Sequence, residues 1–275
     1  TVGTRGGNFV IENCDVLLVL GCRMNIRQIS YNFRDYAKNA YKIMVDIDAA
    51  ELQKPTFKAD LPVHANVKDV IGALLSVESK TTETQSRWLQ WCRNINAQYP
   101  ATLPSYYAIK KPMNPYAFMT EFFKQLSEGD DIICGNGSAC VITFQAANLK
   151  KGQRMFTNSG CAAMGYGFPA AVGCAVANGK KRTFCIDGDG SFQMNIQELQ
   201  TVVYNHLNIK IIYLNNNGYH SIRQTQTNLF KPPLVGVCDG NGLSFPDAGK
   251  IAGAYGLPFV KIDNIDDVAA KMKIV

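Results

Sequence analysis

The chain has 275 residues, of which 47% are hydrophobic and 18% charged, and 28 basic against 22 acidic residues give a net charge of +6. At roughly 100–200 residues per domain, this length suits one large or two smaller domains. The composition argues against disorder, and no run approaches the roughly 18 apolar residues of a membrane-spanning helix. The basic residues are scattered, which argues against nucleic-acid binding.

The cysteine pattern indicates a reducing compartment. The nine cysteines have no Cys-x-x-Cys spacing, and most lie in apolar runs such as the one around Cys185. This pattern favours buried free thiols over disulfides or metal ligands. The first residue is Thr1, and no signal-peptide pattern follows it. We therefore expect a cytoplasmic protein and a piece of a longer chain.

Residues 1–78 alternate between predicted strands and helices. Apolar runs at 16–20 and 43–47 are typical of strands in a parallel sheet that is covered on both faces. A short helix is predicted at 48–52, and residues 67–75 have apolar side chains at helical spacing. Two strands are too few for an independent doubly wound sheet. This region is therefore predicted to be part of a larger α/β domain.

Residues 79–113 are polar, contain both tryptophans and several prolines, and are predicted to be a linker with one helix. From residue 114 the alternation resumes. Strands are predicted at 131–134, 182–186, 209–214 and 258–262, and helices at 141–149, 192–206 and 246–255. This order predicts a doubly wound parallel sheet over 114–275.

One turn in this second region has the residues of a cofactor site. The run Gly188-Asp189-Gly190-Ser191 follows a predicted strand and opens a predicted helix. Its glycines allow close backbone approach, and amide groups at a helix start suit a phosphate. Asp189 would repel that phosphate unless it holds a divalent cation that bridges to it. Taken alone, Asp189 also suits a turn or a helix N-cap.

A second polar run follows the next predicted strand. Residues 215–218 read Asn-Asn-Asn-Gly, a sequence that by itself is typical of a turn. Adjacent parallel strands present their carboxyl ends at the same edge of a sheet. Oxygen atoms of Asp189, Asn216 and a backbone carbonyl, completed by diphosphate oxygens, would suit octahedral Mg²⁺.

The order of Gly188-Asp189-Gly190, a helix, a strand and Asn215-Asn216 resembles the signature of thiamine-diphosphate-dependent enzymes. Its context resembles the acetolactate synthase group of that family. Residues 160–171 are similar to the Gly-rich segment of the group, and residues 15–23 to its central domain. The resemblance implies that 1–78 are the C-terminal half of the central domain, and that 114–275 are a diphosphate-binding domain truncated at its C-terminus.

The resemblance also implies thiamine diphosphate and Mg²⁺ as cofactors, a homo-oligomer, and decarboxylation of a 2-keto acid followed by carboligation of the activated aldehyde. The implied Mg²⁺ ligands are Asp189, Asn216 and the Gly218 carbonyl. The residues that would line the diphosphate are Gly188, Gly190, Ser191, Tyr219 and His220. The Ala162 carbonyl would receive the aminopyrimidine amino group, and Met164 would support the bent cofactor, although Met164 taken alone is more typical of core filler.

The chain departs from the family pattern in several places. The activating glutamate of the family has no counterpart here, so the chain alone is expected to be inactive. Arg23 and Arg27 resemble an arginine pair near FAD and the acceptor substrate, which makes Arg27 a candidate substrate contact. The intervening Asn25-Ile26 and the sequence His64-Ala65-Asn66 differ from the flavin-carrying relatives and argue against FAD, which stays an alternative.

Ile222 and Thr225 resemble substrate-facing positions, and Thr225 replaces a tryptophan that is usual in biosynthetic members. The acceptor substrate is therefore left open. The alternative function is a non-catalytic cofactor- or nucleotide-binding α/β module. The chain has no G-x-G-x-x-G fingerprint with an acidic residue about 20 positions later, which argues against an ordinary dinucleotide site.

Overall fold

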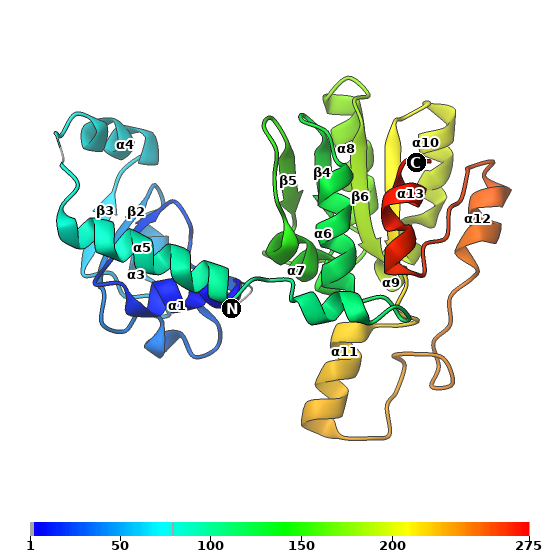
Figure 1. Ribbon diagram of the computed structural model, residues 1–275, viewed down its shortest axis with the longest axis horizontal. Helices are drawn as coiled ribbons and strands as arrows, with labels where there is room; N and C mark the ends of the chain where they lie inside the picture. The colour runs from blue at the N-terminus through cyan, green and yellow to red at the C-terminus, as the bar shows by residue number, and fades with distance from the viewer. Residues whose placement is uncertain (1–2, 79, 275) are drawn as a thin grey trace. The chain divides into compact units, whose positions relative to one another are not determined.

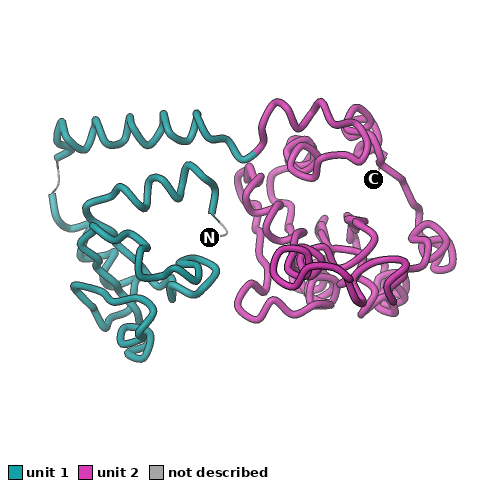
Figure 2. The backbone as a smooth tube through the Cα atoms, turned by 90° about the horizontal axis from the view of Figure 1, so that it is seen from below, with its two compact units in different colours: residues 1–101 teal, residues 102–275 magenta. Residues whose placement is uncertain are grey.

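The structure is a computed structural model that describes residues 3–78 and 80–274. The chain divides into two compact units, residues 1–101 and 102–275, which are coloured separately in Figure 2. Among the described helices, none combines the length and the apolar character that crossing a membrane requires.

Unit 1 contains a three-stranded parallel sheet in the order β1-β2-β3. The strands are β1 (Val16–Leu20), β2 (Tyr41–Asp46) and β3 (Leu61–His64), and the helices are α1 (Arg5–Asn13), α2 (Ile26–Ile29), η1 (Phe33–Asp35), α3 (Ala49–Gln53), α4 (Val67–Leu75) and α5 (Glu83–Gln98). The strands predicted at 16–20 and 43–47 are confirmed as β1 and β2. The helix predicted at 67–75 is α4, which begins where the Asn66 side chain accepts a hydrogen bond from the Lys68 amide. β3 was not predicted, because it is short and contains Pro62.

Helix α5 is part of unit 1. A capping box between Thr82 and Gln85 begins the helix. The helix packs against α1, and at its end the ring of Tyr99 lies 4.9 Å from that of Phe9 and 5.0 Å from the Arg5 guanidinium. The unit boundary after residue 101 therefore falls inside the predicted 79–113 linker, because packing on α1 joins this helix to the first unit.

Unit 2 contains a four-stranded, entirely parallel sheet in the order β5-β4-β6-β7, with helices on both faces (Figure 1). The expected doubly wound sheet is therefore confirmed. The strands are β4 (Asp131–Cys134), β5 (Arg154–Thr157), β6 (Thr183–Gly188) and β7 (Ile209–Leu214). The helices are η2 (Pro104–Ala108), α6 (Pro115–Gln125), α7 (Gly137–Ala146), α8 (Gly167–Ala177), α9 (Asp189–Phe192), η3 (Gln193–Glu198), α10 (Leu199–Tyr204), α11 (His220–Thr225), η4 (Gln226–Phe230), α12 (Ala248–Ala254), η5 (Ile265–Asp267) and α13 (Val268–Met272).

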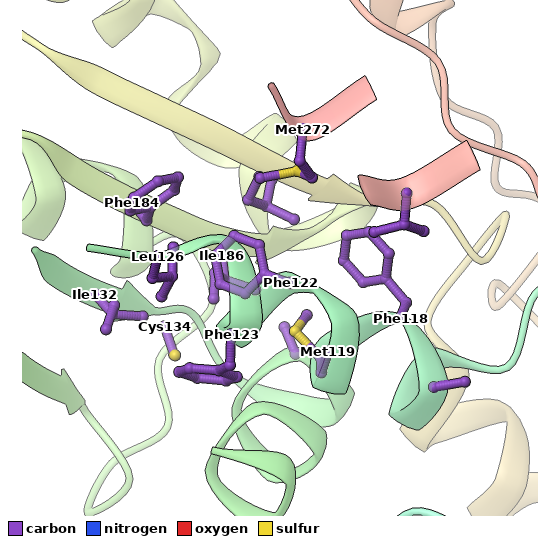
Figure 3. Packing of buried hydrophobic residues seen from close by; sticks show 14 of the residues in the cluster. Phe118, Met119, Phe122, Phe123, Leu126, Ile132, Cys134, Phe184, Ile186 and Met272 are labelled. Atoms are coloured by element: carbon purple, nitrogen blue, oxygen red, sulfur yellow. The ribbon is translucent and has the colours of Figure 1, made fainter. Parts of the chain in front are cut away.

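Each face of this sheet has its own hydrophobic core. On one face, aromatic side chains of α6 pack against β4, β6 and α13, and Phe122 meets Phe184 edge-on at 5.3 Å (Figure 3). On the other face, α8 and α10 cover β4 and β6 around Phe168 and Cys185. Successive residues of one strand point to opposite faces, so β4 contributes Ile132 to the first core and Ile133 to the second. The burial of both faces explains the continuous apolar runs of these strands.

In unit 2, three details differ from the sequence predictions. Residues 258–262 do not form a strand, because Pro258 lacks an amide donor and no described strand pairs with this segment. The helix predicted at 192–206 is broken into η3 and α10, with non-helical dihedral angles at Asn195. Strand β5 was not predicted, because only four residues form it at the edge of the sheet.

Candidate functional site

The carboxyl ends of β4 and β6 form the switch point of the unit 2 sheet. From β4 the chain crosses through α7 to β5 on one side, and later returns through α8 to β6 on the other side. The chain therefore leaves these two adjacent strand ends toward opposite sides of the sheet, and open α/β sheets bind their ligands at such a point. The Gly-Asp-Gly turn follows β6 directly, so it lies at this switch point.

Asp189 brings the three predicted magnesium ligands together. Its side chain is 1% exposed. Its Oδ1 accepts a hydrogen bond from the Gly190 amide at 2.8 Å. Its Oδ2 accepts from the amides of Asn216 at 3.0 Å and Gly218 at 3.2 Å. These bonds fasten the loop after β7 to the loop after β6.

Two buried oxygen atoms at this point have no hydrogen-bond partner in the described structure. They are Oδ1 of Asn216 and Oδ2 of Asp187. Burial also raises the pKa of Asp187 to about 6. No ion pair among residues 3–78 and 80–274 involves Asp187 or Asp189. Uncompensated oxygen atoms in a buried acidic site are what a cation would stabilise.

The available ligands suit magnesium better than a transition metal. No group of three His, Cys, Asp or Glu side chains that could hold an ion occurs in the part of the chain that the structure describes. The site instead offers a carboxylate, an amide oxygen and backbone carbonyls. Hard cations such as Mg²⁺ prefer these oxygen donors, and they commonly share such sites with phosphate oxygens. The residues therefore fit a magnesium ion that is completed by a diphosphate.

The Gly-rich segment 160–169 joins the same site. Ala162 has a positive φ of 52°, and its carbonyl accepts a hydrogen bond from the Asn136 side chain at 2.9 Å. The Gly165 amide donates to Ser191 Oγ at 2.9 Å. Met164 lies half-buried between these two anchored residues. The predicted residues Ala162, Met164 and Ser191 are thus brought to one edge of the sheet.

Tyr219 and His220 follow the Asn-Asn loop at the start of α11. A side-chain carbon on Gly190 would lie 2.3 Å from the Tyr219 ring, so only glycine fits beneath this ring. His220 Nδ1 lies 3.3 Å from the Arg223 guanidinium, which also donates to the Asn216 carbonyl at 3.2 Å. Arg223 therefore places a positive charge beside the loop that would hold the metal.

The three predicted substrate contacts, Arg27, Ile222 and Thr225, lie outside the loops that follow β6 and β7. Ile222 and Thr225 line an open, mainly apolar pocket of about 340 Å³ beside η4. Arg27 is exposed on α2 in unit 1, and its neighbour Arg23 forms an ion pair with Glu51 at 2.8 Å. The roles of Arg27, Ile222 and Thr225 toward a substrate stay predictions.

Two asparagines at the site were missed in the sequence analysis. Asn136 could have been found, because Gly135-Asn136-Gly137 follows a strand and opens a helix just as the Gly-Asp-Gly turn does. Asn195 donates to the Gly165 carbonyl at 2.7 Å. No sequence signal marked Asn195, since it lies inside a segment predicted to be one continuous helix.

Comparisons with known proteins show the family of the chain. Residues 135–275 match the family described as thiamine pyrophosphate enzyme, C-terminal TPP binding domain, and residues 1–74 match its central domain. The chain is 29% identical over 98% of its length to the acetolactate synthase isozyme 1 large subunit of Escherichia coli. It is 30% identical over 99% of its length to the acetolactate synthase large subunit of Lactococcus lactis. The chain spans about half the length of these curated relatives, 46% of each.

Proposed function

The chain belongs to the thiamine pyrophosphate enzyme family, and from that premise we propose that it forms the cofactor-binding part of a carboligase of the acetolactate synthase type. The proposed reaction is the decarboxylation of a 2-keto acid followed by transfer of the activated aldehyde to an acceptor. The observation that carries this proposal is the convergence of Asp189, Asn216 and Gly218 at the switch point of the sheet.

The chain's own residues have distinct roles in this proposal. Thiamine diphosphate, when bound, supplies the group that stabilises a carbanion next to the former carboxylate. Asp189, the Asn216 side chain and the Gly218 carbonyl would hold Mg²⁺ against the diphosphate, whose charge the ion offsets. Gly188, Gly190, Ser191, Tyr219 and His220 would line the diphosphate, and residues 162–164 would orient the aminopyrimidine. By fixing the orientation of the cofactor, these residues would position its reacting groups relative to one another.

We propose Ile222 and Thr225 as substrate contacts because they line the open pocket next to α11. Arg27 is proposed as a further contact on the basis of the family resemblance. The assembly proposed for the protein is a cytoplasmic homo-oligomer. Because no glutamate among residues 1–275 has the context of the activating one, the 275-residue chain alone is expected to have no activity. FAD stays an alternative cofactor of unit 1, and the flavin absorbance of the purified protein tests it.

The metal site is tested by titrating thiamine diphosphate into the full-length protein with and without Mg²⁺ in a calorimeter. Asp189→Asn keeps the shape of the side chain but removes its charge. Loss of a hydrogen-bonded neighbour of a metal ligand typically costs about 10–100-fold in affinity, so loss of the ligand itself should weaken Mg²⁺-dependent binding by about 100-fold or more. Asp247→Asn is the matched control, because Asp247 only caps α12. Unchanged binding by Asp189→Asn would remove this residue from the metal site.

Turnover separates the proposed enzyme from a non-catalytic binding module. Full-length protein loaded with both cofactors is incubated with pyruvate and other small 2-keto acids. We expect carbon dioxide release and a product with a new carbon–carbon bond, detected by mass spectrometry. Cofactor binding without either product would favour the non-catalytic module, and binding of NAD in place of thiamine diphosphate would favour a nucleotide-binding one.

A further inference from the structure

Residues 236–241 fold around a single side chain, that of Asn241. Its Oδ1 accepts hydrogen bonds from the amides of Val237 at 2.9 Å and Cys238 at 2.8 Å. The Asn241 carbonyl accepts from the Gly236 amide at 2.6 Å, and its own amide donates to the Cys238 carbonyl at 3.2 Å. One carboxamide oxygen thus satisfies two consecutive amides and gives this loop its shape.

This 236–241 loop lies directly against the predicted metal and diphosphate residues. Gly218 and Cys238 form an antiparallel bridge, and the Tyr219 amide donates to the Val237 carbonyl at 2.9 Å. A side-chain carbon on Gly218 would lie 2.1 Å from that carbonyl oxygen. Val237 itself is 1% exposed. The position of Val237 therefore sets the position of Gly218 and Tyr219.

Gly218 and Tyr219 are held from the opposite side by the turn after β6. The Gly218 amide donates to Asp189 Oδ2 at 3.2 Å, and the Tyr219 ring covers Gly190. The two residues lie between a carboxylate on one side and the Val237 carbonyl on the other. Removing either support would let this segment move away from the other.

We propose that Asn241 is a positioning residue for the cofactor site, acting through Val237 on Gly218 and Tyr219. This inference rests on the proposed function. None of the hydrogen bonds in the described part of the chain joins Asn241 to a predicted cofactor ligand, but without its Oδ1 the amides of Val237 and Cys238 lose their acceptor. The 236–241 loop would then sample other conformations, and the Gly218 carbonyl would no longer be fixed in the position proposed for metal binding. Supporting residues of this kind keep a binding site preorganised.

The test uses the full-length protein and three variants. Asn241→Ala removes the acceptor, Asn241→Asp keeps an oxygen that can accept from both amides, and Asn205→Ala is the matched control. Asn205 also bonds local backbone, through the Thr201 carbonyl, but lies at the end of α10. Calorimetry measures Mg²⁺-dependent thiamine diphosphate binding. We expect affinity to fall about 10–100-fold in Asn241→Ala and to stay near wild type in Asn241→Asp and Asn205→Ala.

Hydrogen exchange gives a readout that does not need the cofactor. The Tyr219 amide should exchange faster in Asn241→Ala than in wild type, and at the wild-type rate in Asn205→Ala. If Asn241→Ala does not fold, Asn241→Gln replaces it, because one extra methylene displaces the oxygen while the amide chemistry is retained. Wild-type affinity in Asn241→Ala, or in Asn241→Gln where it replaces that variant, would overturn this inference alone. Absence of any Mg²⁺-dependent binding by the wild-type protein would overturn the proposed function and this inference with it.

Discussion

Asn216, in the loop after β7, has a buried side-chain oxygen without a hydrogen-bond partner in the described structure. The backbone amide of Asn216 donates a hydrogen bond to Asp189, and its backbone carbonyl accepts one from Arg223. Its side-chain Oδ1, by contrast, is unpaired in the described structure. Leaving a buried acceptor unsatisfied costs about 1–3 kcal/mol. This unpaired oxygen supports the proposal that the Asn216 side chain serves a ligand, because active-site residues often depart from such packing rules.

Asn216→Ala should therefore separate stability from binding. Without Mg²⁺ and cofactor, removal of the unpaired oxygen should leave the free energy of unfolding unchanged or raise it by about 1 kcal/mol. Mg²⁺-dependent cofactor affinity should fall. The neighbouring Asn215→Ala is the control, since Asn215 Oδ1 accepts from the Asn217 amide at 2.9 Å and its loss should destabilise the loop. Urea unfolding in a chelator measures both variants. Equal destabilisation by the two would argue against a ligand role for Asn216.

Helix α8 is tightly packed at its first residue, next to the candidate site, and has open space beside a glycine in its middle. Its first residue, Gly167, lies so close to the sheet that an added carbon would be 2.7 Å from Asp187 Oδ2 and 2.8 Å from the Gly135 Cα. The close approach lets the helix start next to the carboxyl ends of β4 and β6. Gly173, in the same helix, has nothing within 4 Å of such a carbon.

Two alanine substitutions in α8 are therefore expected to have opposite signs. Gly167→Ala should lower the free energy of unfolding by about 1–3 kcal/mol, because the new methyl group overlaps Asp187 and the backbone of Gly135. Gly173→Ala should raise it by about 0.5–1 kcal/mol, because alanine is the better helix former and has space. Urea unfolding monitored by circular dichroism measures the difference. A stabilising Gly167→Ala would show that the start of α8 is not packed as described.

The reactivity of the cysteines can test the packing of both units in one experiment, because some are exposed and others are buried. Cys22 in unit 1 and Cys161 in unit 2 are exposed, whereas Cys134 and Cys185 are buried in the sheet of unit 2. Burial raises the pKa of the Cys134 and Cys185 thiols far above the usual range. Only a thiolate reacts readily with alkylating reagents. The buried pair should therefore be inert in the folded protein.

Iodoacetamide labelling at pH 8, read by peptide mass spectrometry, should modify Cys22 and Cys161 and spare Cys134 and Cys185 until the protein is unfolded. Thiamine diphosphate with Mg²⁺ should slow labelling of Cys161, which adjoins Ala162, and leave Cys22 unaffected as an internal control. If calorimetry shows binding but Cys161 is not protected, the 160–169 segment does not adjoin the bound cofactor.

Local patterns in the amino-acid sequence were enough to predict many of the secondary-structure elements. The apolar runs predicted β1, β2, β4, β6 and β7, and the helix at 67–75 was delimited correctly. The order of the Gly-Asp-Gly and Asn-Asn runs pointed to a cofactor site. The strands follow from the periodicity of apolar side chains, and the helix from its periodicity and its N-cap. The cofactor site follows from glycines and polar residues placed directly after strands. The strands and the helix depend on neighbours within a few positions along the chain, which a sequence displays directly.

The neighbours of each strand and the contacts that hold the loops could be seen only in the folded protein. The order β5-β4-β6-β7 places the switch point beside Asp189, and it brings Asn136 to Ala162 and Asn195 to Gly165. It also leaves residues 258–262 without a strand partner in the described chain. Asn241 acquires its position because 236–241 folds back onto Gly218. Such contacts join residues far apart in sequence, and the packing of the whole sheet and its helices selects them, so local pattern does not reveal them.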